Sequence, residues 1–169
     1  VVSAYVLGYG GFMLLGGRAA DLLGRRRMFL LWLTVFLLFS GLGGLATEGW
    51  MLLASRFATG VAAAFLTPAG LALLTGTFAE GRERTRALGV YAGTAAGGFS
   101  LGLVAGGLLA AAGWRWVFFA PVILSAALLA AAIPLMREPA REDHPAGGFD
   151  IAGALSATGA MLALAYAVV

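Results

Sequence analysis

The sequence contains neither cysteine nor lysine, and it has one histidine, His144. Without cysteine, no disulfide framework and no cysteine-ligated metal site can form, and a single imidazole is too few for a zinc site built from histidines. Charged residues are also scarce, at 11% of the 169 residues, whereas ordinary soluble domains carry roughly a quarter. These absences argue against a disulfide scaffold, a zinc module and an ordinary soluble domain.

Apolar residues take the place of the missing charge. They make up 61% of the chain, and the mean hydropathy is +0.93. This composition indicates a membrane protein. The eleven basic residues are all arginines, and the net charge is +3. Because most of them lie in short stretches between apolar runs, we relate them to membrane topology and expect no nucleic-acid partner.

A membrane-spanning helix needs about 20 predominantly apolar residues. Six stretches meet this requirement, at residues 1–17, 28–46, 50–78, 87–112, 115–136 and 151–169. We therefore predict an all-α polytopic membrane protein with about six transmembrane helices. It consists of a helical bundle over 1–136, a polar linker at 137–150 and the start of a further transmembrane helix at 151–169. Since the chain enters an apolar run at Val1 without an initiator Met, we expect a fragment of a longer protein.

The arginines predict which side of the membrane each connection occupies. Counting alternate connections, one side holds nine arginines and the other holds only Arg115. Positively charged connections stay in the cytoplasm, so the first side is cytoplasmic. The nine are Arg18, Arg25, Arg26, Arg27, Arg82, Arg84, Arg86, Arg137 and Arg141. Trp50, Trp114 and Trp116 belong to the two external connections, where amphipathic rings prefer to lie at the headgroup level.

The first cytoplasmic connection contains an acid that topology does not explain. Retention of positive charge in the cytoplasm accounts for Arg25, Arg26 and Arg27, but acids contribute little to topology. The carboxylate of Asp21 can pair with these guanidinium groups or accept from backbone N–H groups at a helix start. We therefore predict a cytoplasmic latch, defined as Asp21 with Arg25 and Arg26, that holds two helices together and can be released.

Arg56 lies about two turns inside a predicted span. A charged residue there costs at least a few kcal/mol unless it is paired or reaches water, so it is a candidate functional residue. The alternative is that its side chain extends to the nearby external interface past Trp50.

Small and hydroxylated residues mark two further features. Gly89, Gly93 and Gly97 are spaced four apart, as are Gly98, Gly102 and Gly106, which predicts two smooth faces for close helix packing on one helix. Thr67, Thr75, Thr77 and Ser100 could line a polar path, or could bond back to their own helix backbone.

The pattern of Gly17, Asp21, Gly24, Arg25 and Arg26 resembles the loop between the second and third helices of the major facilitator superfamily of secondary transporters, with Leu22 where the family often has Arg. The resemblance extends over essentially the whole chain. It implies that the chain covers helices two to seven, so that the bundle at 1–136 is an N-terminal half without its first helix. The short link to the last predicted helix is similar to the fourteen-helix drug/proton antiporter branch.

Two further motifs support this resemblance. Arg56, Gly60, Ala63 and Ala64 resemble the family's fourth-helix motif, with Thr59 in place of Gln, which implies a proton and substrate pathway at Arg56 and Thr59. The stretch at 87–112 would be the family's fifth helix, and its glycines resemble the helix-packing motif of the drug/proton antiporters. Leu103 stands where that motif has Pro. The matching glycines are Gly102, Gly106 and Gly107, and Gly98 of the same spacing completes the predicted helix-packing motif.

The chain also shows weak internal symmetry of the kind found in transporters with inverted repeats. A shift of 89 positions places a cytoplasmic turn on an external one. It aligns Gly8, Gly17, Gly24, Arg26 and Phe29 with Gly97, Gly106, Gly113, Arg115 and Phe118.

The resemblance implies proton-coupled efflux of small amphiphilic compounds by alternating access across a bacterial-type plasma membrane. The expected partners are protons, a small-molecule substrate, the bilayer and the remaining half of the transporter, and no metal or organic cofactor is implied. Two alternatives stay open: a specific solute carrier of the same fold, and a polytopic scaffold or sensor without transport. An intramembrane enzyme is disfavoured, because the spans hold no nucleophile and base at helical spacing.

Overall fold

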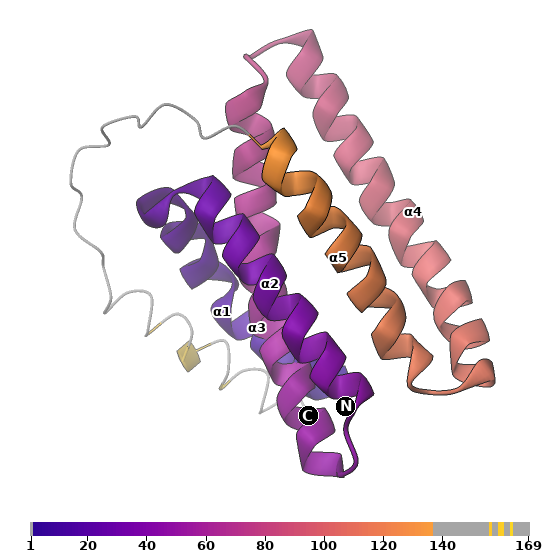
Figure 1. Cartoon of the computed structure of the whole chain (residues 1–169). Coiled ribbons are helices and arrows are strands. Elements are labelled where there is room, and N and C mark those ends of the chain that lie inside the picture. The colour runs from indigo at the N-terminus through magenta and orange to yellow at the C-terminus, as the bar shows by residue number, and fades with distance from the viewer. Residues whose placement is uncertain (1, 137–155, 157–158, 161–162, 164–169) are drawn as a thin grey trace.

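The computed structural model describes residues 2–136 together with Ser156, Gly159, Ala160 and Ala163. Residues 2–136 form five helices joined by short links (Figure 1). These are α1 (Val2–Leu23), α2 (Arg25–Gly44), α3 (Gly49–Thr77), α4 (Arg82–Ala112) and α5 (Trp116–Leu135). The predicted all-α polytopic fold class is confirmed. The predicted linker at 137–150 and most of the predicted helix at 151–169 lie outside the described residues, and the four described positions of that stretch are helical.

The helices are arranged around α3. It packs against both α1 and α2, and α5 packs against the other side of α2. Figure 1 shows α4 at the edge of the molecule, where it lies beside α5 and makes only limited contact with α3 and α5. The bundle is therefore tightly packed among α1, α2, α3 and α5, and open at α4.

Four of the described helices, α2 to α5, are long and apolar enough to cross a membrane. α1 is 22 residues long, and it contains five glycines as well as Arg18 and Asp21, which dilute its apolar character. It runs alongside α3, so its length and packing are those of a neighbouring span.

Three predicted helix ends on the cytoplasmic side are wrong. α1 continues to Leu23 instead of ending at residue 17, α2 begins at Arg25 instead of residue 28, and α4 begins at Arg82 instead of residue 87. The prediction counted apolar residues, which marks only the part of a helix within the hydrocarbon layer. The helices continue into the interface, where charged side chains reach water and the backbone hydrogen bonds still favour the helix.

The contact between α1 and α3 is made through glycines. A methyl group at Gly16 would lie 2.5 Å from the carbonyl oxygen of Ala64, and one at Gly8 would lie 2.5 Å from that of Phe57. Both distances are too short for a real Cβ, so only glycine permits this approach of the two backbones. Such small-residue contacts replace the hydrophobic effect as the basis of helix association in lipid.

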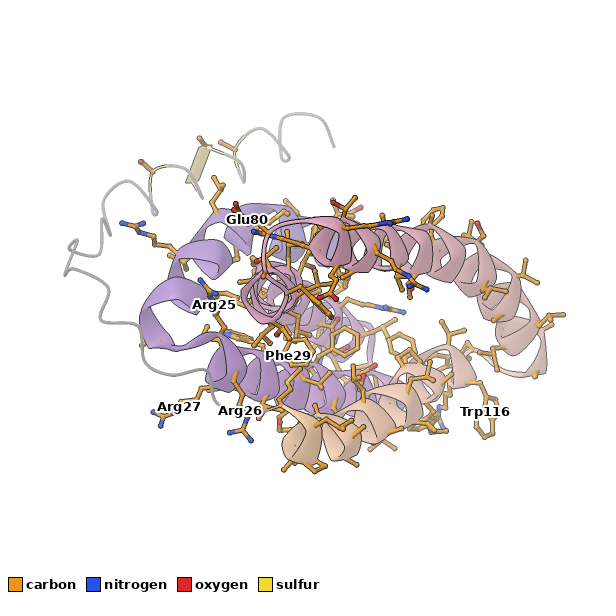
Figure 2. All side chains as sticks on the ribbon, turned by 90° about the horizontal axis from the view of Figure 1, so that it is seen from above. Arg25, Arg26, Arg27, Phe29, Glu80 and Trp116 are labelled. Atoms are coloured by element: carbon orange, nitrogen blue, oxygen red, sulfur yellow. The ribbon has the colours of Figure 1, made fainter. Side chains whose placement is uncertain are left out.

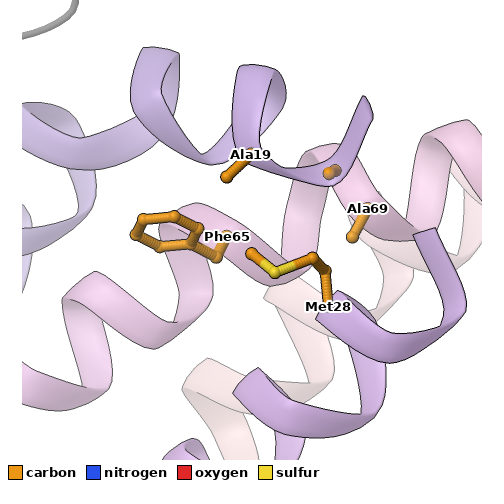
Figure 3. Close-up of a cluster of buried hydrophobic side chains, with 5 residues drawn as sticks. Ala19, Met28, Phe65 and Ala69 are labelled. Atoms are coloured by element: carbon orange, nitrogen blue, oxygen red, sulfur yellow. The ribbon is translucent and has the colours of Figure 1, made fainter. Parts of the chain in front are cut away.

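A cluster of buried apolar side chains joins α1, α2 and α3 (Figure 3). Met28 extends from the start of α2 toward Phe65 and Ala69 of α3, and Ala19 covers them from α1. The ring of Phe65 also stacks on Trp32, with the ring centroids 4.1 Å apart. This cluster fixes the three helices relative to one another near the cytoplasmic connection between α1 and α2.

Candidate functional site

The link between α1 and α2 is a single residue, Gly24. Its φ angle of 93° lies in the region that favours glycine, which allows the chain to reverse between two helices without a longer loop. Gly17 lies near the end of α1 and faces Pro68 of α3. A Cβ added at Gly17 would be 3.8 Å from the Cβ of that proline. Gly24 thus serves the tight turn through its backbone conformation, while the contact at Gly17 is of ordinary van der Waals length.

Arg25 reaches from the start of α2 to the end of α3. Its Nη1 donates a hydrogen bond to the carbonyl oxygen of Ala72, at 3.3 Å. Gly76 makes room for it, since a Cβ at that glycine would lie 2.7 Å from the same nitrogen. Figure 2 shows Arg25 on the inner side of α2, whereas Arg27 points outward.

Arg26 makes the equivalent contact with a different helix. Its Nη2 donates to the carbonyl oxygen of Ile133, at 3.1 Å, in the last turn of α5. The last carbonyls of a helix have no partner within the helix, and a cation near them is favoured by the helix dipole. Arg26 therefore binds the last turn of α5, whereas Arg25 binds a carbonyl within α3, five residues before that helix ends.

This role of Arg25 and Arg26 was missed from the sequence, which assigned them to topology and to the predicted latch. The available signal was that α3 and α5 end on the same side of the membrane as the arginines, so their carbonyl ends were natural acceptors. The side chain of Asp21 lies outside the described residues. Its part in the cytoplasmic latch stays a prediction.

Arg56 is half-buried between α3 and α5. The central carbon of its guanidinium group lies 4.2 Å from the centroid of the Phe118 ring, a cation–π contact. Tyr5 of α1 is close enough to interact with it electrostatically. Within the described part of the chain, no carboxylate pairs with Arg56, and its buried Nε has no hydrogen-bond acceptor.

This placement bears on the two alternatives for Arg56. Phe118 is the third residue of α5, near the external end of the bundle, while Arg56 is the eighth residue of α3. The guanidinium group of Arg56 thus lies toward the external end of the bundle. Its contact there is with the buried ring of Phe118, which is only 6% exposed. Phe118 was not singled out from the sequence, because nothing local predicts a contact between residues 62 positions apart.

The hydroxyl groups confirm the alternative of bonding to their own helices. Thr67, Thr75 and Thr77 each donate to the carbonyl four residues earlier, at 2.9, 3.0 and 2.7 Å, and Ser100 does so at 3.3 Å. Thr59 is buried, and its hydroxyl lies 3.0 Å from the carbonyl oxygens of both Ser55 and Arg56. The predicted pathway role of Thr59 stays a prediction, and in this structure its hydroxyl is engaged by its own backbone.

The predicted helix-packing face lies on α4 and has no partner among the described helices. A Cβ added at any of its glycines would meet no atom within 4 Å, which applies to Gly98, Gly102, Gly106 and Gly107. No described residue of α4 between Arg82 and Ala112 is buried. The prediction that this face packs against another helix therefore stays open, and none of α1, α2, α3 and α5 is that helix.

The two turns that the 89-position shift aligns share their local geometry. Gly24 ends the link between α1 and α2 with φ 93°, and Gly113 links α4 to α5 with φ 152°. α2 begins directly after Gly24, and α5 begins three residues after Gly113. The two hairpins thus share a glycine with positive φ at the turn, and the internal repeat stays a prediction.

Comparison with known proteins identifies relatives over the whole chain. The sequence model of the Major Facilitator Superfamily matches residues 1–168. The puromycin resistance protein pur8 of Streptomyces alboniger is 44% identical over 170 positions, which cover 99% of this chain and 33% of that protein. The cephamycin export protein CmcT of Amycolatopsis lactamdurans is 38% identical over 169 positions, covering 99% and 35%.

A third relative is the multidrug resistance protein Stp of Mycobacterium tuberculosis (strain CDC 1551 / Oshkosh). It is 36% identical over 170 positions, which cover 100% of this chain and 31% of that protein. The chain thus spans about a third of the length of these relatives.

Proposed function

The chain belongs to the major facilitator superfamily, as its motifs predicted, and we propose that it forms part of a secondary transporter that exports small amphiphilic compounds in exchange for protons. It is a multi-pass plasma-membrane protein of bacterial type. The direction of transport is supported by the names of the relatives, which refer to antibiotic resistance, antibiotic export and multidrug resistance.

The proposed mechanism is alternating access. Two halves of the transporter rock about a central site, and proton binding changes which face is open. Residues 1–136 would supply the N-terminal half without its first helix, and a second half would complete the substrate site. The direct partners are then protons, the small-molecule substrate, the bilayer and that second half.

The observation that carries the proposal is the position of Arg56. A guanidinium group lies within a transmembrane helix, partly buried and without a carboxylate partner among the described residues. A cation of this kind is costly in a membrane and is retained where it serves a pathway. We assign Arg56 to the proton and substrate pathway, with Thr59 on the next turn.

The cytoplasmic motif is proposed to control opening on the other face. Arg25 and Arg26 each bind a backbone carbonyl of another helix, and Gly24 allows α1 and α2 to meet at a link of one residue. The carboxylate of Asp21, in the same connection, would add an acid to this group. We propose that breaking the cytoplasmic latch accompanies opening toward the cytoplasm.

The open face of α4 is proposed to receive the first helix of the bundle. Under the 89-position shift, α4 corresponds to α1, which packs on α3 through Gly8 and Gly16. The helix that corresponds to α3 would precede α1 in the chain, and α4 carries Gly97 and Ala105 at the positions that correspond to Gly8 and Gly16. Gly97→Leu should then lower the folded yield of the full-length protein, and full yield and activity would show that this face meets lipid.

The test of the function uses the full-length protein in inside-out membrane vesicles. Uptake of a fluorescent amphiphilic cation is followed with and without an uncoupler, for the parent, Arg56→Ala and Arg115→Ala. Arg115 is the matched control, because it lies in an external link and its guanidinium contacts Trp114, 5.4 Å from the ring centroid. Uptake that collapses with the uncoupler and with Arg56→Ala, but not with Arg115→Ala, is the expected result.

Other outcomes favour the alternatives. Absence of uptake across a panel of amphiphilic cations, with transport of one particular solute, would identify a specific solute carrier. Normal activity of Arg56→Ala would remove Arg56 from the pathway. Failure to move any solute, with a cellular role that survives Arg56→Ala, would favour the scaffold or sensor.

A further inference from the structure

We propose that Phe118 is a positioning residue for the transport reaction, because its ring fixes where the guanidinium group of Arg56 lies. This inference rests on the proposed function, since it assigns a second residue to the site of Arg56. The two side chains come from different helices, α5 and α3, and the separation of 4.2 Å is well within the range of a cation–π contact.

Two described residues interact with this cation: the Phe118 ring lies over the guanidinium group, and Tyr5 of α1 interacts with it electrostatically. No described carboxylate pairs with Arg56, and its Nε is buried without an acceptor. The attraction between a cation and the face of an aromatic ring increases when both are removed from water. Because Phe118 is 6% exposed, its face attracts the guanidinium group more strongly than a ring on the surface would.

Phe118 is itself held from two directions. The hydroxyl of Ser40, on α2, donates to the backbone carbonyl of Phe118 at 3.2 Å. The ring of Trp114, in the turn before α5, meets the Phe118 ring edge to face, with centroids 6.0 Å apart and an angle of 88°. The backbone of Phe118 is therefore tied to α2, and its ring cannot move without disturbing the contact with Trp114 in the external turn.

Gly43 of α2 leaves the space that the ring occupies. A Cβ at that position would lie 2.7 and 2.8 Å from two atoms of the Phe118 ring and 2.8 Å from the hydroxyl oxygen of Ser55. Any larger residue would push the ring toward Arg56 or away from it. Three helices thus converge on one aromatic ring, and Arg56 is the only charged group in this junction among the described residues that contact Phe118.

The uncharged partner has a consequence for transport. A carboxylate in this place would neutralise Arg56 and hold it in a paired geometry that is costly to break. The ring attracts the cation and leaves its net charge intact. Arg56 therefore keeps a full positive charge at a defined place near the external end, and the position of α5 determines that place.

The test replaces Phe118 in the full-length transporter by phenylalanines of increasing fluorination. Fluorine withdraws electron density from the ring face while the shape changes little, so the cation–π attraction decreases stepwise. We expect proton-driven uptake of the amphiphilic cation to decrease along the series, by about tenfold at full fluorination. Phe118→Leu, which removes the aromatic ring, should show a similar loss.

Two controls separate the contact from general packing. The same series at Phe119, a half-buried neighbour that packs near Gly44, should leave uptake unchanged. In an Arg56→Gln background, the thermal midpoint of the purified protein should no longer depend on fluorination at Phe118, whereas it should fall along the series when Arg56 is present.

The outcomes distinguish this inference from the proposed function. If Arg56→Ala abolishes uptake while fluorination at Phe118 changes neither uptake nor the midpoint, the positioning role is overturned and the proposed function stands. If Arg56→Ala transports normally, the proposed pathway fails, and the positioning role fails with it. A graded loss that requires Arg56 supports both.

Discussion

Gly60 is the position where the packing of α1 on α3 has the least tolerance. A methyl group on its Cα would lie 2.2 Å from the backbone carbonyl oxygen of Tyr5. Backbone atoms cannot rotate aside as a side chain can, so Gly60→Ala must push the two helices apart. Gly70 lies on the same helix, and its methyl group would be 3.6 Å from the Phe29 ring, an ordinary contact. Gly70→Ala is therefore a matched control.

The pair of variants isolates the cost of the collision. Both replace glycine by alanine within α3, and both gain the same helix propensity, about 1 kcal/mol. This gain cancels in the comparison. Overpacking a tight interior costs about 1–3 kcal/mol, so Gly60→Ala should be less stable than Gly70→Ala by that amount. The ratio of folded to unfolded protein then differs about 5- to 150-fold between them.

The measurement is the thermal midpoint of the full-length protein in detergent, followed by size-exclusion chromatography after heating. We expect the midpoint of Gly60→Ala below that of the parent and the midpoint of Gly70→Ala at or above it. Equal midpoints for the two variants would refute the argument that α1 and α3 approach most closely at Gly60.

Three further predictions concern the cytoplasmic face. Asp21→Asn should increase thiol labelling of a Leu23→Cys reporter if the acid holds the cytoplasmic latch, and unchanged labelling would rule the latch out. Arg26→Gln should lower the thermal midpoint, because the carbonyl of Ile133 loses a cation worth about 0.5–2 kcal/mol; an unaltered midpoint would mean that this contact contributes nothing. Gly24→Ala should cost about 1–3 kcal/mol through its φ of 93°, measured as folded yield, and normal yield would contradict the strained turn.

The fold class was predictable because it depends on composition and on the length of the apolar runs along the chain, whereas the membrane sidedness inferred from the arginines stays a prediction. An apolar run of sufficient length has to be helical in lipid, since only a helix satisfies its backbone hydrogen bonds locally. The ends of helices were harder to predict. Leu23 and Arg25 are both helical although charged residues surround them, because hydropathy marks the hydrocarbon layer and not the end of hydrogen bonding.

The candidate site was predictable only in part. Arg56 stood out because a charge in an apolar run is unusual, whatever surrounds it. Its contact with Phe118 was not predictable, since phenylalanine in an apolar helix is ordinary and the pairing depends on how α3 and α5 lie in space. Arg25 and Arg26 were recognised as charges, but their acceptors are backbone carbonyls of distant helices, which carry no mark in the sequence.

Among the described helices, few contacts fix the tilt of α4. A glycine with positive φ stands at each end of this helix, Gly81 with 135° and Gly113 with 152°, and few contacts join its length to the rest. Tilting α4 therefore disturbs few of the described contacts, whereas tilting α3 separates it from both α1 and α2. If a further helix covers the glycine face of α4, as proposed above, that helix would set the angle of α4 more than α1, α2, α3 or α5 do.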